Sequence, residues 1–219
     1  MPSINNYKFK KFKIFKAIIS CSLNFLRNVP RGYIDLLFLP FDSNKPLPKC
    51  AIEELLKITS DLNNLKIDYL VTDGTILGLF RDGKLISHDN DIDIALMDTK
   101  DLLKLIKNYL AKKWIIIRIL IKNFHLYQII FYKDGIVLDF CNWKKKNDLV
   151  YFRAPEINGL RIQPYYYYEP IKYKLADIDL LSHPNLKEWI CEHYGEDWET
   201  PKTVKGDWRE DCKDIIEFK

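Results

Sequence analysis

Two aspartates stand two residues apart in the segment Asp91-Ile92-Asp93-Ile94. If this segment is a β-strand, its side chains alternate between the two faces, so both carboxylates point one way and both isoleucines the other. Two negative charges held this close repel each other unless a cation neutralises them. Carboxylates, a few waters and substrate phosphates are the ligands that Mg²⁺ or Mn²⁺ prefers. The spacing therefore predicts a divalent metal site that carries a phosphorylated ligand.

The residues before this strand predict a place for the phosphate. Residues 67–71 are typical of a buried strand, and Asp73-Gly74-Thr75 is typical of the turn that begins a short helix. Glycine lets the backbone approach a ligand closely, and the first N–H groups of a helix attract anions. Thr75 adds a hydroxyl, and Arg81 adds a guanidinium that binds phosphate with two hydrogen bonds.

Each of these pieces also has a simpler interpretation. An isolated Asp-x-Asp is usually a solvated strand edge, a Gly-Thr pair is usually a helix cap, and a single arginine is usually a surface residue. Here a strand, a Gly-Thr turn, a short helix and an acidic strand follow one another within about thirty residues, the length of one supersecondary unit. That order favours the functional interpretation.

This arrangement resembles the LicD/fukutin-related family of the nucleotidyltransferase-fold superfamily. That family looks like a Gly-Thr-x-Leu-Gly turn and helix, then an arginine, a short hairpin that ends in isoleucine, and an acidic Asp-x-Asp-Ile-Asp strand. The chain follows this pattern in order and without gaps at Gly74, Thr75, Leu77, Gly78, Arg81, Ile86, Asp89, Asp91, Ile92 and Asp93.

The chain departs from the family pattern at three positions. Asp73 stands where a second glycine is usual, His88 where tryptophan is frequent, and Asn90 where a further aspartate is common. No expected metal ligand is lost, and Asp73 and His88 point to a different substrate. A second, weaker similarity covers residues 192–198, a Tyr-Gly-acidic-aromatic segment, although a helix C-cap at Gly195 explains it without any function.

A third carboxylate is predicted at Asp139. It stands inside the apolar, β-branched run of residues 135–141, and a charge in a buried strand is costly unless it is paired or bound to a metal. Pairing with a lysine among residues 144–146 is the simpler interpretation. We favour the metal ligand, because the family resemblance also implies an aspartate on this strand.

The periodicity of the chain predicts an α+β fold in which helices cover a mixed β-sheet, and the resemblance implies the nucleotidyltransferase (polymerase beta-like) fold. The predicted helix over residues 99–112 is capped by Asp98 or Thr99. An N-terminal basic helix and a C-terminal helical or irregular extension complete the prediction. The main elements are predicted as helices over residues 51–65 and 99–112, and strands over 114–120 and 126–132.

Composition places the protein among cytoplasmic enzymes. The chain has 219 residues, of which 47% are hydrophobic, enough for a sizeable core. Its formal net charge is only +4, which argues against a basic nucleic-acid binder. The five cysteines are odd in number and lack metal-binding spacing, which indicates a reducing compartment and no zinc site.

The sequence predicts two parts, a basic amphipathic segment with a linker over residues 1–47 and a catalytic domain over 48–219. Lysines alternate with bulky apolar residues over 8–16, before an apolar stretch over 17–26. That stretch is too short to span a bilayer and lacks a convincing signal-peptide cleavage site. The segment therefore either lies on the anionic inner face of the cytoplasmic membrane or packs on the catalytic domain.

The resemblance implies a transferase that moves phosphocholine, glycerol phosphate or ribitol phosphate from a CDP-activated donor to a sugar hydroxyl. The acceptor would be a bacterial cell-surface glycan, such as capsule, teichoic acid or lipopolysaccharide, free or linked to lipid. Two alternatives stay open. A true nucleotidyltransferase would attach a nucleotide to a protein, RNA or small molecule, and a non-catalytic module would bind nucleotide without turnover.

Roles for individual residues follow from the motif and the resemblance together. Asp89 and His88 are the candidates to accept the proton of the acceptor hydroxyl, and we favour Asp89. The metal is assigned to Asp91, Asp93 and Asp139. The donor phosphates are assigned to Gly74, Thr75, Gly78 and Arg81.

Overall fold

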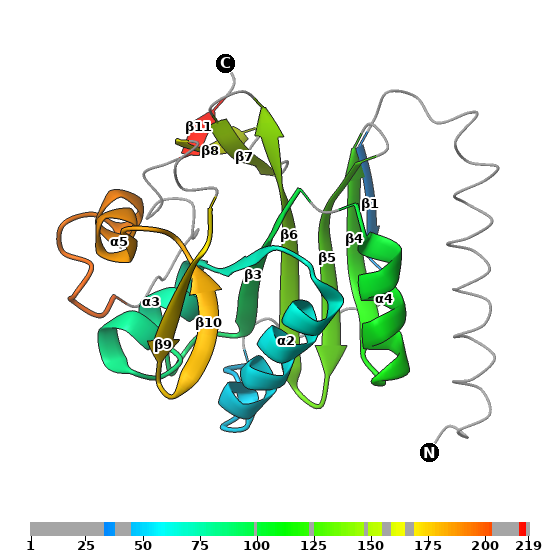
Figure 1. Ribbon diagram of the computed structural model, residues 1–219, viewed down its shortest axis with the longest axis horizontal. Helices are drawn as coiled ribbons and strands as arrows, with labels where there is room; N and C mark the ends of the chain where they lie inside the picture. The colour runs from blue at the N-terminus through cyan, green and yellow to red at the C-terminus, as the bar shows by residue number, and fades with distance from the viewer. Residues whose placement is uncertain are drawn as a thin grey trace.

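A nine-stranded mixed sheet organises the part of the chain that the computed structural model describes, which is residues 33–37, 45–98, 100–122, 125–146, 149–154, 159–164, 169–202 and 215–217 (Figure 1). Its main body has the spatial order β1-β4-β5-β6-β3-β2, and the far end of β6 continues into β7-β8-β11. The strands are β1 (Tyr33–Leu37), β2 (Tyr69–Val71), β3 (Asp91–Met97), β4 (Ile115–Lys122), β5 (His125–Lys133), β6 (Ile136–Lys146), β7 (Leu149–Ala154), β8 (Gly159–Pro164) and β11 (Ile215–Glu217).

The pairing of β3 with β6 is parallel, whereas the other pairings of described strands are antiparallel. The register places Asp93 of β3 beside Asp139 of β6. Along β3 the aspartates are half-buried, while Ile92 and Ile94 are buried in the main core. This alternation confirms the strand predicted from the Asp-Ile repeat. It places the aspartates on one face of β3 and the isoleucines on the opposite face.

Two helices, α2 (Ala51–Leu65) and α4 (Leu102–Ala111), lie in front of the sheet in Figure 1. α2 begins and ends where the periodicity predicts. α4 begins at Leu102 and not at residue 99, and Asp101 at its N-cap makes no side-chain capping bond. The reason is that Asp98 is still tied to the sheet by a hydrogen bond: its N–H donates to the carbonyl of Trp143, and its φ of +47° is not that of a right-handed helix. Thr99, the alternative cap, lies outside the described residues.

The C-terminal part of the chain packs beside β2. β9 (Ile171–Leu175) and β10 (Ile178–Ser182) form a separate two-stranded hairpin, and β10 lies next to β2. α5 (Leu186–Tyr194) follows and ends at Gly195, whose φ is +95°, so the predicted C-cap is confirmed. α3 (Asp73–Asp82) directly follows β2 in the chain and packs against β3.

The N-terminal part of the chain contributes one described strand. β1 pairs with β4 and forms an edge of the sheet, although residues 1–47 were predicted to be a segment apart from the catalytic domain. Its backbone groups satisfy those of β4, which would otherwise form an open edge. The predicted basic helix lies outside the described residues. Within the described ranges, no helix combines the length and the apolar character needed to cross a membrane.

Gly78 of α3 lies where the following loop crosses the helix. A Cβ at this position would lie 2.7 Å from the carbonyl oxygen of Lys84 and 2.9 Å from the backbone nitrogen of Ile86. We therefore expect Gly78→Ala to lower the free energy of unfolding by about 1–3 kcal/mol, because backbone must move to admit the methyl group. Urea unfolding measures this change.

Gly83→Asn is the matched control. A Cβ at Gly83 has nothing within 4 Å, and asparagine tolerates its φ of +65°. We expect this control to lower stability by no more than about 1 kcal/mol, because its only cost is the left-handed φ that asparagine tolerates. Equal effects of the two substitutions would contradict the packing role of Gly78.

Candidate metal centre

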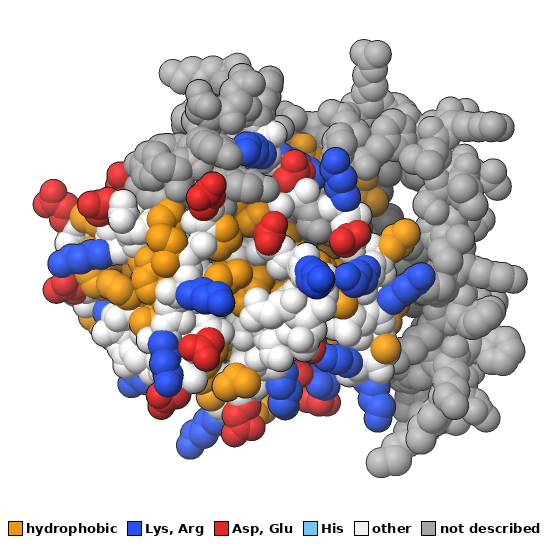
Figure 2. All heavy atoms as spheres, viewed as in Figure 1, with side chains coloured by type: hydrophobic (Ala, Val, Ile, Leu, Met, Phe, Trp, Pro, Cys, Tyr) orange, Lys and Arg blue, Asp and Glu red, His pale blue; other side chains and the backbone are white. Residues whose placement is uncertain are grey.

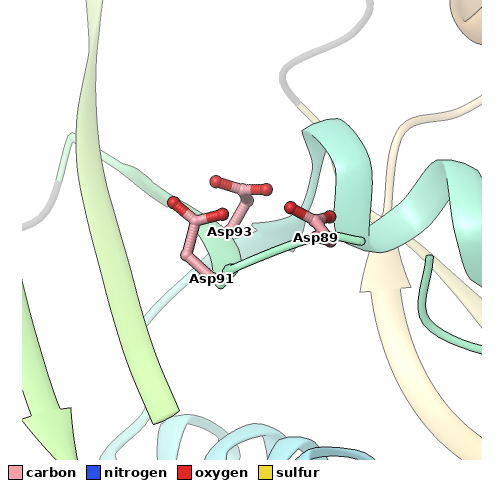
Figure 3. Close-up of side chains that lie close together, drawn as sticks. All are labelled: Asp89, Asp91 and Asp93. Atoms are coloured by element: carbon pink, nitrogen blue, oxygen red, sulfur yellow. The ribbon is translucent and has the colours of Figure 1, made fainter. Parts of the chain in front are cut away.

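Asp89, Asp91 and Asp93 each bring one carboxylate oxygen to within 4.8 Å of the others. Figure 3 shows the three carboxylates gathered at the start of β3. β3 supplies Asp91 and Asp93, and the loop between α3 and β3 supplies Asp89. Three hard oxygen donors at this separation fit a divalent cation such as Mg²⁺ or Mn²⁺. The aspartate group can therefore hold a metal ion, as the Asp-x-Asp spacing predicted.

Asp139 lies next to this group on the neighbouring strand. Only 8% of Asp139 is exposed, and its Oδ2 accepts a hydrogen bond of 2.6 Å from Nε2 of Gln128. Of the lysines 144–146 considered as partners of Asp139, Lys144 pairs instead with Asp98 at 2.9 Å. The assignment of Asp139 as a metal ligand stays a prediction, since its oxygens lie outside the group formed by the other three.

Burial and mutual repulsion raise the pKa of each of these carboxyls. For Asp91 and Asp93, desolvation is the larger cause, neighbouring aspartates add to it, and the pKa lies well above the ordinary value. Desolvation also raises the pKa of Asp89 and brings that of Asp139 to about 7. Protons therefore compete with a cation for this site.

The Gly-Thr turn holds the acidic residues in place. A Cβ on Gly74 would lie 2.5 Å from Oδ2 of Asp89, so only glycine leaves room for that carboxylate. Thr75 is fully buried, and its hydroxyl accepts the backbone N–H of Asp93 at 2.8 Å. Thr75 therefore ties α3 to β3. Its assigned contact with phosphate stays a prediction.

Two other predicted donor-binding residues, Arg81 and Gly78, have close contacts outside the aspartate group. Arg81 stands about 10 Å along the axis of α3 from Gly74, at a rise of about 1.5 Å per residue. Its guanidinium binds both carboxylate oxygens of Asp82, at 3.1 and 2.8 Å, and lies 3.5 Å from the carbonyl of Trp198. Gly78 is buried under the loop that follows α3. Arg81 thus contacts both its neighbour in the chain and the C-terminal part, and the assignment of Arg81 and Gly78 to the donor phosphates stays a prediction.

His88 is exposed and stands immediately before Asp89. Its charge lowers the pKa of Asp89, although burial of Asp89 outweighs this effect. Asp89 itself, our favoured proton acceptor, belongs to the group that can hold a metal. The structure therefore places both sequence candidates at the site, but in different environments.

Two histidines that the sequence analysis did not single out reach the turn before Gly74. His183 Nε2 lies 3.1 Å from the hydroxyl of Thr72, and His193 Nε2 lies 3.4 Å from Oδ1 of Asp73. Both histidines are buried. Their partners are more than a hundred residues away, so no local pattern could reveal them. The one available signal was Asp73 itself, which replaces a glycine usual in the family.

The chain belongs to the LicD/FKTN/FKRP nucleotidyltransferase-domain family, whose model matches residues 66–179. This match confirms the resemblance and contains the Gly-Thr turn, the three clustered aspartates and Asp139. Family membership supports a transferase function of the phosphotransferase kind in glycan modification. A comparison with curated proteins gave no match.

Two solved structures show a distant likeness to this chain. The lincosamide antibiotic adenylyltransferase LnuA, with lincomycin bound, has 16% identity and a TM-score of 0.47, and the match covers 66% of this chain and 85% of LnuA. An antigenic nucleotidyltransferase-like protein from Paracoccidioides brasiliensis has 12% identity and a TM-score of 0.39, with coverage of 68% and 69%. Neither likeness carries an argument about substrate.

Gly74→Ala tests the space that Asp89 needs. We expect Mn²⁺ affinity to fall about tenfold, as for other changes that displace a metal ligand. The added methyl group would push the Asp89 carboxylate away from Asp91 and Asp93. Titration followed by electron paramagnetic resonance measures free Mn²⁺, and Gly83→Asn serves as the control. Unchanged affinity in Gly74→Ala would contradict this role.

Asp139→Asn tests the electrostatic strain in the metal-free protein. The folded pKa of about 7 lies above the ordinary 3.8, so the folded state holds a proton that the unfolded chain releases. Stability then falls as pH rises from about 4 to 7, by about 4 kcal/mol for this group at about 1.4 kcal/mol per pKa unit. The Asp139→Asn substitution removes that share and flattens the dependence.

Urea unfolding at pH 4 and pH 7.5, with EDTA present, measures this difference. Asp68→Asn is the control, because Asp68 is exposed and we expect it to keep the wild-type dependence on pH. The same loss of stability between the two pH values in Asp139→Asn and in wild type would refute the assignment.

Proposed function

We propose that this chain is a metal-dependent transferase that moves a phospho-alcohol from a CDP-activated donor to a sugar hydroxyl of a bacterial cell-surface glycan. The observation that carries the proposal is the convergence of Asp89, Asp91 and Asp93 beside a Gly-Thr turn, in a chain of the LicD/FKTN/FKRP family. Phosphocholine, glycerol phosphate and ribitol phosphate are the candidate groups.

In this proposal the three aspartates hold the cation, Mg²⁺ or Mn²⁺, and Asp139 supports the site from β6. When bound, such a cation neutralises the charge on the donor diphosphate and on the leaving phosphate oxygen. Desolvation of the aspartates strengthens their attraction for the cation, because fewer water molecules screen it. Without a cation, the four carboxylates would repel a diphosphate. With the cation bound, they would hold it where the diphosphate can bind.

The start of α3 lies beside this place and offers N–H groups to a donor phosphate. Thr72 at the N-cap makes no side-chain capping bond to the helix, since its hydroxyl bonds to His183. With Asp89 inside the metal group, His88 is the residue we assign to accept the proton of the attacking hydroxyl. Its exposure allows an acceptor sugar to reach it.

The proposed acceptor is a capsule, teichoic acid or lipopolysaccharide glycan, either free or linked to a lipid. The proposed location is the cytoplasm, with the basic segment within residues 1–47 resting on the inner face of the membrane. Nucleic acid is not a proposed partner. On the face shown in Figure 2, lysine and arginine side chains are intermixed with aspartate and glutamate and do not form a continuous basic stripe.

The test is a panel of nucleotides with the purified full chain and Mn²⁺. Heat unfolding identifies which of CDP-choline, CDP-glycerol, CDP-ribitol, CTP, ATP and UDP-glucose raises the midpoint temperature, and CMP release then measures turnover. We expect a metal-dependent shift and CMP release with one CDP-alcohol. Asp91→Asn should lower that rate by about 100- to 1,000-fold, the equivalent of several kcal/mol.

Asp68→Asn is again the control and should keep the wild-type rate. A shift with CTP or ATP together with pyrophosphate release would replace the proposal by nucleotidyl transfer. Binding without turnover, unaffected by Asp91→Asn, would indicate a non-catalytic module.

A further inference from the structure

A stack of three rings lies between β10 and the C-terminal end of α5. The rings of His183 and Trp189 have centroids 3.8 Å apart at 7°, and those of Trp189 and His193 lie 4.9 Å apart at 9°. Tyr194 closes the stack edge-on at 4.5 Å and 89°. Because the two histidines and the tryptophan are at most 1% exposed, their ring orientations are fixed by packing.

This stack faces the turn that leads into the metal centre. Three successive residues of that turn each contact the C-terminal part of the chain. The Ser182 hydroxyl donates to the carbonyl of Val71 at 2.8 Å. The next two contacts join His183 to the Thr72 hydroxyl at 3.1 Å and His193 to the Asp73 carboxylate at 3.4 Å. Residues of β10, of the loop after it and of α5 therefore each contact one of three consecutive residues, Val71 to Asp73.

Asp73 has a backbone conformation that glycine adopts more easily than other residues. Its φ is +51°, in the left-handed region, where aspartate is tolerated but glycine is free of strain. The glycine usual at this position in the family would therefore fit the same turn. The chain has accepted a strained residue in its place, and the carboxylate that this residue adds is held by a buried histidine.

Asp73 also stands beside the metal centre. Gly74, the next residue, borders the Asp89 carboxylate so closely that a Cβ there would lie 2.5 Å from its Oδ2. Thr72, the preceding residue, donates its N–H to the carbonyl of Asp93 at 3.2 Å. Asp73 thus lies between two residues that adjoin the metal-binding aspartates, while its own oxygens lie outside the group within 4.8 Å.

We propose that Asp73 is a further acidic group of the metal centre, which acts on the cation from outside its ligand set, and that His193 positions it. A carboxylate just outside the ligand set would attract a bound cation and accept hydrogen bonds from water bound to it. Cation affinity then depends on α5, although α5 supplies no ligand. This inference rests on the metal centre of the proposed function, but not on the identity of the donor or acceptor.

The alternative is that the Asp73–His193 contact only anchors α5 to the domain. Both versions predict lower stability when the contact is lost. They differ in Mn²⁺ affinity, which a purely structural contact leaves unchanged in protein that is still folded. A double-mutant cycle on Mn²⁺ affinity therefore separates them.

The experiment measures the Mn²⁺ dissociation constant of wild type, Asp73→Gly, His193→Gln and the double variant at 15 °C, after circular dichroism has shown that each is folded. We expect Asp73→Gly to weaken Mn²⁺ binding about tenfold. We expect His193→Gln to weaken it about threefold with Asp73 present and not at all in the Asp73→Gly background, because there is then no carboxylate left to position. Glu188→Gln removes one exposed charge from the first turn of α5 and should change nothing.

Each outcome decides the question. Asp73→Gly relieves the strained φ, so it should fold even if His193→Gln does not, and it tests the first half of the proposal alone. Wild-type affinity in Asp73→Gly would overturn the inference and leave the proposed function standing. An equal effect of His193→Gln in the wild-type and Asp73→Gly backgrounds would remove His193 as the positioning residue. Absence of Mn²⁺ binding in wild type would overturn both proposals, whereas the expected cycle without any CMP release would overturn the donor assignment only.

Discussion

Repulsion among carboxylates in a small, desolvated space is the constraint on which the rest of this structure depends. The parallel pairing of β3 with β6 sets Asp93 beside Asp139, and Asp91 and Asp89 continue the same acidic group. Protons or a cation relieve this repulsion. The fold must therefore supply enough favourable packing elsewhere to keep the four residues together when neither ligand nor metal is bound.

That packing comes from the same strand. Ile92 and Ile94 alternate with the aspartates and are at most 1% exposed, in contact with the core beneath α2. Burial of each such side chain contributes about 1.5–3 kcal/mol. Because side chains alternate strictly along a strand, movement of the aspartates would withdraw the isoleucines from the core. The acidic site is rigid because its opposite face is apolar.

Local polar contacts then set the details of the site. The Thr75 hydroxyl holds the N–H of Asp93, and Gln128 holds one oxygen of Asp139. Neither residue needs to touch a substrate to matter, since each limits how far a carboxylate can move. Gly74, which has no side chain, leaves the space that the Asp89 carboxylate occupies. Precision at the metal centre therefore comes from neutral residues as much as from charged ones.

Sequence reasoning located the acidic strand, α2, the Gly-Thr turn and the strand of Asp139, because each is encoded by a local period or a short motif. It failed where the deciding contact lies elsewhere in the chain. The start of α4 was placed too early, because Asp98 donates its N–H to the carbonyl of Trp143 on β6 and has a left-handed φ. The assignment of Arg81 to a phosphate stays a prediction, and its guanidinium binds Asp82 in this structure. The contacts of His183 and His193 could not be predicted for a different reason. The Thr72–His183 bond joins residues 111 positions apart, and such contacts form only after the intervening chain has closed into a loop.

This separation has a consequence for biosynthesis. A ribosome that adds about 5–20 residues per second makes the turn at Val71–Asp73 several seconds before it makes the segment that holds it. During that interval the nascent chain already carries Asp89, Asp91 and Asp93, while the ring stack that fixes the neighbouring turn does not yet exist. The acidic centre therefore reaches its final structure late in synthesis, only after α5 has been made.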